Sequence, residues 1–259
     1  MKLSFVKYSG NGNDFIIVEE NRDFALSSSQ IQKLCSRHFG VGADGVLLLG
    51  KPEGVDASMR IFNADGGEAE MCGNGLRCLA TYLDQQTKNK KEKYLIRTMN
   101  NTYEVGKRNG AFAILMNDIK DENAVDLSEF RDYEKKFYIN TGVPHLVFLG
   151  KDVKKIDIKK SAPAYRFHAR FPRGTNVSFV ELLPGQQCAY VRTYERGVED
   201  ETHSCGTGLT ASGLALSHWF GWKGDIHLET LGGKQIVSVE KSVYYSGEVT
   251  FCFAGEVEL

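Results

Sequence analysis

A cysteine followed by Gly-x-Gly and an apolar helical run occurs twice in this chain. The copies are MCGNGLRCLATYL at residues 71–83 and SCGTGLTASGLALSHWF at residues 204–220. Their cysteines, Cys72 and Cys205, are 133 positions apart in a chain of 259 residues. Upstream, RIFNADGGEAEMCGNG and RTYERGVEDETHSCGTG each place an arginine-initiated strand and an acidic loop before the motif. The pattern predicts two halves of one design, each a set of strands enclosing one central helix.

Short apolar runs separated by Gly, Asn or Asp predict a chain that is mainly β. The strand-like segments are LSFVKY, DFIIVEE, GVLLLG, ASMRIFN, EKYLIRT, FAILMN, KFYINT, HLVFLG, NVSFVEL, AYVRTYE, IHLET, KQIVSVE and EVTFCFAG. Helical periodicity predicts three helices, at residues 27–40, 73–86 and 206–220. The fold class is therefore α/β of the α+β kind, with two pseudo-symmetric domains, each a set of strands enclosing one central helix.

The domain boundary is expected near residues 115–135, where DIKDENAVDLSEF is acidic and weakly periodic. We expect an N-terminal domain of residues 1–118 and a C-terminal domain of residues 119–249. Because a closed duplicated fold often returns its last strand to the first half, residues 250–259 are expected to belong with the N-terminal domain.

The charge balance argues against nucleic acid or an anionic membrane as a partner. The chain has 32 basic and 33 acidic residues, and its lysines alternate with acidic or polar residues instead of forming a basic face. The N-terminus has no apolar segment of signal-peptide length, and no window approaches 18 uninterrupted apolar residues. We therefore expect a cytoplasmic protein that acts on a small molecule.

The six cysteines are scattered through a chain too long to need a disulfide scaffold, so we interpret them as free thiols. Four of them have apolar neighbours that favour a buried structural role: Cys35, Cys78, Cys188 and Cys252. This leaves Cys72 and Cys205 as the candidates for chemistry.

A cysteine at a helix start has specific chemical properties. The first backbone amides of a helix have no intrahelical acceptor, so they stabilise a carboxylate or a thiolate, and they are expected to lower the thiol pKa from about 8.5 towards neutrality. If both helix starts face one carbon acid at near-attack distance, their sulfurs are roughly 6 to 7 Å apart. One thiolate can then remove a proton from one face while a thiol returns a proton to the other, as stereoinversion requires.

Other interpretations of the same residues stay open at this point. Cys72 and Cys205 could form a disulfide, or the chain could be a noncatalytic thiol or metal-binding protein. Zinc would need four close ligands, and His203 is the one flanking histidine at a suitable spacing, so we predict no metal site. The segment GNGND at residues 10–14 matches a dinucleotide loop only weakly, because a strand-like run follows it.

At these residues the sequence resembles the diaminopimelate epimerase family over nearly the whole chain. The matching segments are SGNGNDF, VGADG, FNADGGEAEMCGNGLRC, the PH of TGVPH, TNVSFV and YERGVEDETHSCGTG. The resemblance implies two domains of barrel-like strands around a central helix, a homodimer, and cofactor-independent epimerisation of LL-2,6-diaminopimelate to meso-diaminopimelate. That reaction serves lysine and peptidoglycan precursor synthesis.

The resemblance also implies roles for individual residues. Cys72 and Cys205 are the acid/base thiols, with Cys72 the proton donor and Cys205 the acceptor from LL to meso. His145 and Glu195 support catalysis near the thiols. The substrate-binding residues are Asn13, Asn63, Gly73, Asn74, Asn176, Glu195, Arg196, Gly206 and Thr207. Without the resemblance, each of these residues also has a structural interpretation. Asn13 and Asn63 are typical of turns, and Glu195 with Arg196 is typical of a surface ion pair. His145 could be a half-buried histidine that only packs against its neighbours.

Two departures from the family pattern bear on the substrate. Val143 stands where most members have asparagine in Gly-Asn-Pro-His, and the segment from Arg196 to Cys205 is one residue longer than usual. Both are expected to alter recognition of the distal end of the substrate while leaving the inversion chemistry intact. A broader amino-acid racemase or epimerase, with glutamate or proline-type substrates, is therefore the alternative function.

Overall fold

The computed structural model describes residues 2–20, 25–120 and 125–259, and the chain divides into two compact units. The first unit comprises Met1–Leu115 with Ser246–Leu259, and the second comprises Met116–Tyr245. The C-terminal strand lies in the first unit, where it pairs with the N-terminal strand. The predicted domain boundaries, at 1–118 with 250–259 and at 119–249, stay a prediction, and residues 121–124 beside them lie outside the described residues.

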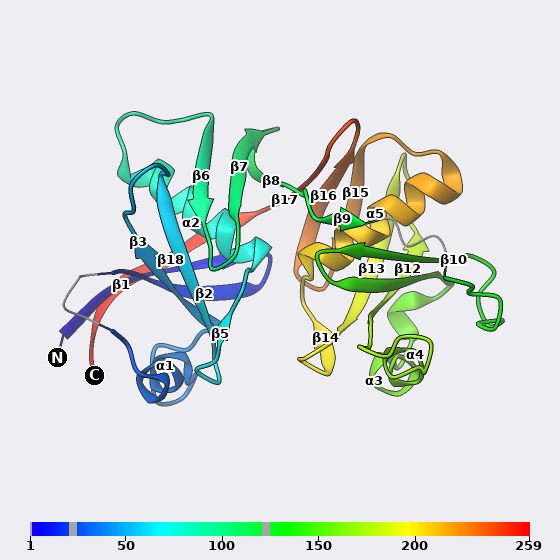
Figure 1. The fold of residues 1–259 in the computed structure, drawn as a ribbon, viewed down its shortest axis with the longest axis horizontal. Coiled ribbons are helices and arrows are strands. Elements are labelled where there is room, and N and C mark those ends of the chain that lie inside the picture. The colour runs from blue at the N-terminus through cyan, green and yellow to red at the C-terminus, as the bar shows by residue number, and fades with distance from the viewer. Residues whose placement is uncertain (1, 21–24, 121–124) are drawn as a thin grey trace. The chain divides into compact units, whose positions relative to one another are not determined.

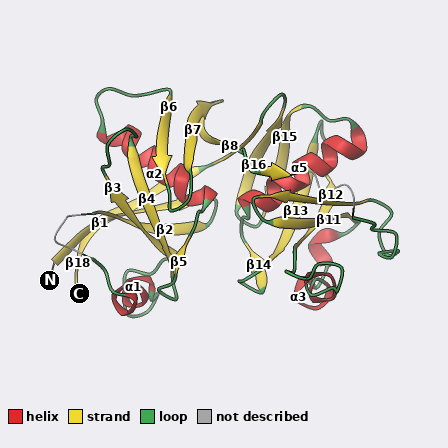
Figure 2. Cartoon of the chain, viewed as in Figure 1, coloured by secondary structure: helices red, strands yellow, loops and turns green. Residues whose placement is uncertain are grey.

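Each unit is built mainly from strands, with one long helix (Figures 1 and 2). The elements of the first unit are β1 (Lys2–Gly10), β2 (Asn13–Glu19), α1 (Ser28–Cys35), β3 (Gly45–Gly50), β4 (Ala57–Asn63), β5 (Glu68–Ala69), α2 (Gly73–Gln86), β6 (Lys93–Arg97), β7 (Thr102–Arg108), β8 (Ala111–Leu115) and β18 (Val249–Glu258).

The second unit repeats this plan with a different covering segment. Its elements are β9 (Ile119–Lys120), β10 (Lys136–Thr141), β11 (Pro144–Leu149), the 3-10 helix η1 (Val153–Lys155), α3 (Ile158–Ser161), α4 (Pro163–Arg166), β12 (Asn176–Leu182), β13 (Cys188–Glu195), β14 (Asp200–Thr202), α5 (Gly206–Phe220), β15 (Gly224–Thr230), β16 (Gly233–Val239) and β17 (Val243–Gly247), whose last two residues belong to the first unit.

The strand pairings confirm the predicted duplication. In the first unit β1 pairs antiparallel with β2, β2 parallel with β3, β3 antiparallel with β4, and β4 antiparallel with β5 and parallel with β6. In the second unit the same sequence of directions joins β10, β11, β12, β13, β14 and β15. A further strand pairs antiparallel with the first strand of each set, β18 with β1 and β9 with β10.

One helix occupies the centre of each unit. Helix α2 packs against β1, β2, β4, β7, β8 and β18, and helix α5 packs against β10, β11, β12, β13, β15 and β16. The opposite face of each sheet is also covered, by α1 in the first unit and by the α3–α4 segment in the second. Strands covered on both faces carry continuous apolar runs, as GVLLLG does in β3, where every residue is buried.

The first predicted helix is shorter than expected, because α1 ends at Cys35 and not at Gly40. Its serine start is confirmed: Ser27 forms a capping box with Gln30. The chain then turns back, so that the amides of Gly40 and Gly42 donate to the carbonyls of Ser36 and Leu34. The turn requires glycine at position 40, since an added Cβ would lie 1.9 Å from the Lys33 carbonyl oxygen.

Some elements lack the pattern that the sequence analysis used. Strand β7, with the sequence TYEVGKR, contains glycine and three charged residues, so its alternation of buried Tyr103 and Val105 is weak. The short elements β5, β9, β14, α3 and α4 span two to four residues each; the strands among them are set by pairing with longer strands, and the two helices pack against β12, β13 and β14. None of the helices in the described ranges is long and apolar enough to cross a membrane.

Candidate active site

Cys72 and Cys205 occupy the same local position in their units. Each is the N-cap residue of the central helix, in an extended conformation, and each carbonyl accepts the first helical hydrogen bond, from Leu76 at 3.0 Å and from Leu209 at 2.8 Å. The predicted position at a helix start is therefore confirmed for both cysteines. The amides that follow each cysteine are the ones that an α-helix leaves without an intrahelical acceptor.

The second glycine of each motif allows the helix start to approach a strand closely. An added Cβ on Gly75 would lie 3.2 Å from Leu47 Cδ2 of β3, and one on Gly208 would lie 3.0 Å from Thr193 Oγ1 of β13. Any side chain at these positions would push the helix start outward. Glycine at the third helical residue thus holds each cysteine against its own sheet.

A matching ion pair anchors the loop before each motif. Arg60 of β4 donates to both carboxylate oxygens of Glu68 at 2.8 and 2.9 Å, and Arg192 of β13 donates to both of Glu201 at 2.7 and 2.6 Å. Bidentate pairs of this kind fix geometry as well as charge. The arginine that opens each duplicated segment therefore ties the first strand of the segment to the short strand that precedes the cysteine.

Cys205 lies among groups that can exchange a proton. Its Sγ is 3.5 Å from Thr207 Oγ1, which in turn is 3.0 Å from Nε2 of His145. The carboxylate of Glu195 interacts with the Cys205 thiol and accepts a hydrogen bond of 2.7 Å from Thr202 Oγ1. The structure thus brings together four residues that the sequence analysis selected, and adds Thr202.

The pKa of Cys205 is raised, which differs from the expected fall towards neutrality. Burial is the largest cause and the nearby charge of Glu195 is the next, and together they outweigh the contacts with Thr207 and Gly208 that favour the thiolate. Burial also raises the pKa of Glu195. The helix start alone therefore does not set the protonation of Cys205. A neighbouring carboxylate that readily takes a proton accompanies the thiol.

His145 is fully buried, and burial lowers its pKa to about 3, with the charge of Arg196 as the second cause. Its Nδ1 has no hydrogen-bond partner among the described residues. The imidazole is accordingly neutral at physiological pH, and it contacts Thr207 and not Cys205 directly. Its predicted supporting role in catalysis stays a prediction.

The buried neutral histidine predicts a measurable pH dependence of stability. Since the pKa of His145 is lower in the folded state than the usual value of about 6.5, its contribution is complete above about pH 6.5 and is lost as the pH falls towards 3. We expect the free energy of unfolding of the wild type to lose about 2 kcal/mol from this group between about pH 7.5 and pH 5. The free energy of unfolding of His145→Gln, measured with urea, should lack this pH-dependent loss. The difference in free energy of unfolding between wild type and variant should therefore be smaller at the lower pH. If this difference in free energy of unfolding is the same at both pH values, His145 is not buried in its neutral form.

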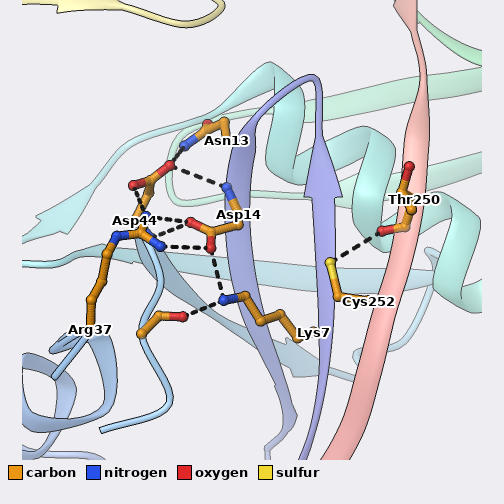
Figure 3. A network of polar contacts seen from close by, with 8 residues as sticks. Lys7, Asn13, Asp14, Arg37, Asp44, Thr250 and Cys252 are labelled. Atoms are coloured by element: carbon orange, nitrogen blue, oxygen red, sulfur yellow. Dashed lines mark hydrogen bonds and ion pairs between the residues drawn. The ribbon is translucent and has the colours of Figure 1, made fainter. Parts of the chain in front are cut away.

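Among the groups near Cys72 are the side-chain amides of Asn13 and Asn74. Cys72 Sγ donates to Asn13 Oδ1 at 3.7 Å, and Asn74 Nδ2 donates to the same oxygen at 3.3 Å. Asn74 Oδ1 accepts from Arg77 Nη2 at 2.7 Å, and the Arg77 side chain is fully buried. Figure 3 shows the other side of Asn13, where its Nδ2 donates to Asp44 at 2.9 Å. The structure thus brings the predicted Asn13 and Asn74 to Cys72.

Asn176 and Arg196 support a turn in the second unit. Asn176 is buried, its Oδ1 accepts from the Arg196 amide at 2.8 Å, and its Nδ2 donates to the Pro144 carbonyl at 2.9 Å. The Arg196 guanidinium donates to the Arg173 carbonyl at 3.0 Å. Both amide ends of Asn176 therefore have partners within the chain, and its role as a substrate ligand stays a prediction. Asn63 is exposed at the end of β4.

The matching registers show which site positions correspond between the units. In the first unit, Gly45 of β3 pairs with Phe15 and with Asn63. In the second unit, Asn176 of β12 takes the place of Gly45 and pairs with His145. The register of β12 with β13, continued by one residue, then puts Glu195 at the position of Asn63. Since Phe15 and His145 correspond, the residues two positions before them correspond as well, so Val143 takes the position of Asn13. The duplicated frame therefore carries different chemistry in its two copies, with amides around Cys72 and with a carboxylate and an imidazole near Cys205.

Two residues that bind the amides near Cys72 were not predicted from the sequence, Arg77 at Asn74 and Asp44 at Asn13. Arg77 is a fully buried charged residue that follows Leu76 and precedes Cys78 and Leu79 in the helix, and an arginine within this apolar run is the signal that could have identified it. Asp44 lies in VGADG, which contributed to the family resemblance, but nothing in the local sequence connects it with Asn13. The contact of Asp44 with Asn13 becomes visible only through the pairing of β2 with β3.

All six cysteines are thiols, and their burial differs in part from the expectation. Cys35 and Cys78 are buried as predicted, and burial raises the pKa of Cys78 to about 12. The prediction is wrong for Cys252, which is exposed on β18, and Cys188 is only half-buried. The apolar run VTFCFAG suggested burial, but in the structure the central residues of β18 are exposed. Over residues 2–20, 25–120 and 125–259, no group of three or more His, Cys, Asp or Glu residues is placed to hold a metal ion.

Comparisons with known proteins agree with the duplicated cysteine motif. The family model for diaminopimelate epimerase matches residues 5–126 and 137–252. Among curated proteins, the chain is 39% identical to a diaminopimelate epimerase from Methanocella arvoryzae, with 100% of this chain and 98% of the relative covered. It is 34% identical to another from Caldanaerobacter subterraneus, with 99% of this chain and 100% of the relative covered.

Solved structures share the fold at low sequence identity. A phenazine biosynthesis protein of the PhzF family from Bacillus anthracis matches with a TM-score of 0.74 at 14% identity, covering 100% of both chains. A hydroxyproline epimerase from Agrobacterium vitis matches with a TM-score of 0.61 at 14% identity, covering 99% of this chain and 92% of the other. The fold expected from the sequence, of barrel-like sheets around central helices, is therefore confirmed. From its family-model match and its full-length relatives, the chain belongs to the diaminopimelate epimerase family.

Proposed function

We propose that this chain interconverts LL- and meso-2,6-diaminopimelate by a cofactor-independent two-base reaction. The observation that carries the proposal is the duplicated placement of Cys72 and Cys205 at the N-caps of the two central helices. The full-length similarity to diaminopimelate epimerases supports the substrate. The reaction would serve lysine and peptidoglycan precursor synthesis.

In the proposed reaction, the two thiols act on opposite faces of one α-carbon. From LL to meso, Cys205 first gives its proton to Glu195, and the resulting thiolate removes the α-proton of the substrate. Cys72 then donates its own thiol proton to the other face. One proton leaves the carbon and one returns, so the enzyme is left with Cys205 as a thiol, Glu195 protonated and Cys72 as a thiolate, and the starting state needs Glu195 to lose a proton and Cys72 to gain one. Exchange with solvent restores the starting state.

Helix-start amides would hold the carboxylate at the reacting carbon, where negative charge develops. We assign this role to Gly73 and Asn74 in the first unit and to Gly206 and Thr207 in the second. The remaining proposed substrate contacts come from side chains that can bind an ammonium or a carboxylate. They are Asn13, Asn63, Asn176, Glu195 and Arg196.

The decisive experiment uses LL-diaminopimelate in deuterated water, with no pyridoxal phosphate added. We expect meso product with solvent deuterium at one α-carbon, observed by NMR and mass spectrometry. Parallel reactions with glutamate, lysine and proline test the broader racemase alternative, because Val143 replaces an amide at the position that corresponds to Asn13. Epimerisation of proline or glutamate in place of diaminopimelate would overturn the proposed substrate.

The noncatalytic alternative has its own measurement. Elemental analysis of the purified protein should find no stoichiometric zinc, and the metal content should not change in Cys72→Ser or Cys205→Ser. Stoichiometric zinc that is lost in either variant would exclude the two-base reaction, since a zinc-bound thiolate is not available to the substrate.

We further propose a cytoplasmic homodimer. The reducing cytoplasm would keep two unpaired catalytic thiols in the required state. For the dimer, the supporting observation is the run of exposed residues in β18, which includes Phe251 and Phe253 at 48% and 44% exposure and Cys252 between them. Apolar side chains gathered on an exposed strand are typical of a surface that a protein partner covers.

The dimer proposal predicts that Phe251→Glu produces a monomer, because a carboxylate in an apolar interface would be buried without a partner. Analytical ultracentrifugation of the wild type should give about twice the chain mass of 28.9 kDa, and the variant should sediment as a single chain. Leu182→Glu is the matched control, since Leu182 is 43% exposed on β12 in the other unit. A wild-type monomer, or an unaffected Phe251→Glu dimer, would reject this surface as the interface.

A further inference from the structure

Four charged side chains form a network beside Asn13, and no role in the reaction has been assigned to them (Figure 3). In this charged network, Lys7 Nζ lies 2.8 Å from Asp14 Oδ2, and Arg37 donates to both oxygens of Asp14 at 3.1 and 2.9 Å. Arg37 Nη2 also donates to Asp44 Oδ1 at 2.7 Å. Two cations thus bind two carboxylates at the start of β2 and before β3.

The network fixes the position of Asp44. The Asp44 amide donates to Asp14 Oδ1 at 3.0 Å, so the two aspartates are joined through the backbone as well as through Arg37. Burial opposes ionisation of Asp14, yet hydrogen bonds and charge from Arg37 and Lys7 lower its pKa to about 2. Because Asp14 remains ionised, the carboxylate of Asp44 is held in place across the physiological pH range.

Asp44 in turn determines which way the Asn13 amide points. An ionised carboxylate can only accept hydrogen bonds, so the group that faces Asp44 Oδ2 at 2.9 Å has to be the Nδ2 of Asn13. The carbonyl oxygen of Asn13 then faces the opposite way. It accepts from Cys72 Sγ at 3.7 Å and from Asn74 Nδ2 at 3.3 Å.

A second charge fixes the same orientation from the other end. A guanidinium can only donate hydrogen bonds, and Arg77 Nη2 lies 2.7 Å from the side chain of Asn74, so this side chain presents its Oδ1 to Arg77. The Nδ2 of Asn74 then faces Asn13 Oδ1. An anion at one end of the chain of amides and a buried cation at the other therefore impose one direction on both asparagines.

We infer that Asp44 and Arg77 are positioning residues that hold the carbonyl oxygen of Asn13 on Cys72 and so keep Cys72 a thiol until it donates its proton. A carbonyl oxygen stabilises the S–H group as a hydrogen-bond donor and repels a thiolate. Cys205 differs, because it lies beside a carboxylate that can take its proton. The inference deepens the proposed two-base function, in which Cys72 is the donor from LL to meso.

The test measures the protonation of Cys72 in the full-length protein without substrate. Iodoacetamide alkylation is followed across a pH series and resolved by peptide mass spectrometry, so that the reactivity of Cys72 is separated from that of the other cysteines. We expect Asp44→Ala to lower the pKa of Cys72 and to raise its alkylation rate at about pH 7 by about tenfold. Asn13→Ala should do the same, because the acceptor oxygen is then missing.

The double variant separates orientation from simple charge. Since Asp44 is inferred to act through Asn13, Asp44→Ala combined with Asn13→Ala should react no faster than Asn13→Ala alone. If the two effects multiply, Asp44 acts by its charge directly and the inference is wrong. If Asn13→Ala leaves the pH profile of Cys72 unchanged, the inference is also wrong, and this outcome decides the question even where Asp44→Ala fails to fold.

Asp56→Ala is the matched control. Asp56 is an aspartate of the same unit that accepts from Lys91 Nζ at 2.5 Å and from the Leu95 amide at 2.8 Å, and it has no bond to the charged network. Its loss should leave the reactivity of Cys72 unchanged. Because turnover is not measured, the inference can fail while the proposed function holds, and the reverse is equally possible.

Discussion

Replacement of Cys205 by serine is expected to lower the rate of epimerisation on the order of 10²- to 10⁴-fold, the range that a positioned proton-transfer group supplies. The serine hydroxyl has nearly the size of the thiol but is far less acidic, so Glu195 cannot convert it into an effective base. Cys72→Ser should lose as much, because inversion requires a group on each face. The measurement is the appearance of meso product from LL-diaminopimelate, with deuterium incorporation followed in the same reaction.

Cys188→Ser provides the matched control for these variants. Cys188 is half-buried at the start of β13 in the same unit as Cys205, and its Sγ donates to the Gln186 carbonyl at 3.3 Å. It is expected to keep the wild-type rate. Retention of full turnover by either motif variant would refute the role assigned to that cysteine, whatever the control does.

The duplicated fold could be predicted because its signal lies within single segments. The arginine, the acidic loop and Cys-Gly-x-Gly recur in order, and each of these parts has a local structural role: Arg60 and Arg192 bind Glu68 and Glu201, and the second glycine allows close packing. Such features depend on a few neighbouring residues. They are therefore visible in a sequence without knowledge of the tertiary structure.

The protonation of the site could not be predicted in the same way. The rise in the pKa of Cys205 comes from burial and from Glu195 on another element, and a local pattern contains neither quantity. The contact between Asn13 and Asp44 likewise depends on the parallel register of β2 and β3, which brings together residues that are 31 positions apart. The exposure of Cys252 depends on which face of β18 the rest of the unit covers.

Glu195→Gln is expected to reduce the turnover rate about 10²- to 10³-fold, because the amide cannot take a proton from Cys205. The wild type should also lose activity on the acid side, where Glu195 becomes protonated. Since burial raises the pKa of Glu195, this acid limb should lie above the pH at which an ordinary glutamate titrates. Initial rates of both proteins across a pH series would test whether the limb disappears in the variant.

Thr202→Val tests the same carboxylate by shifting the pKa of Glu195, and the carboxylate itself stays in place. The Thr202 hydroxyl donates to Glu195 Oε2 at 2.7 Å and lowers the pKa of Glu195 against the larger effect of burial. Without this hydrogen bond the ionised form is less stable, so the pKa rises further and the acid limb should move to higher pH. A rate that falls equally at every pH would show instead that Thr202 only shapes the loop. An acid limb that moves to lower pH would contradict the assignment of the limb to Glu195.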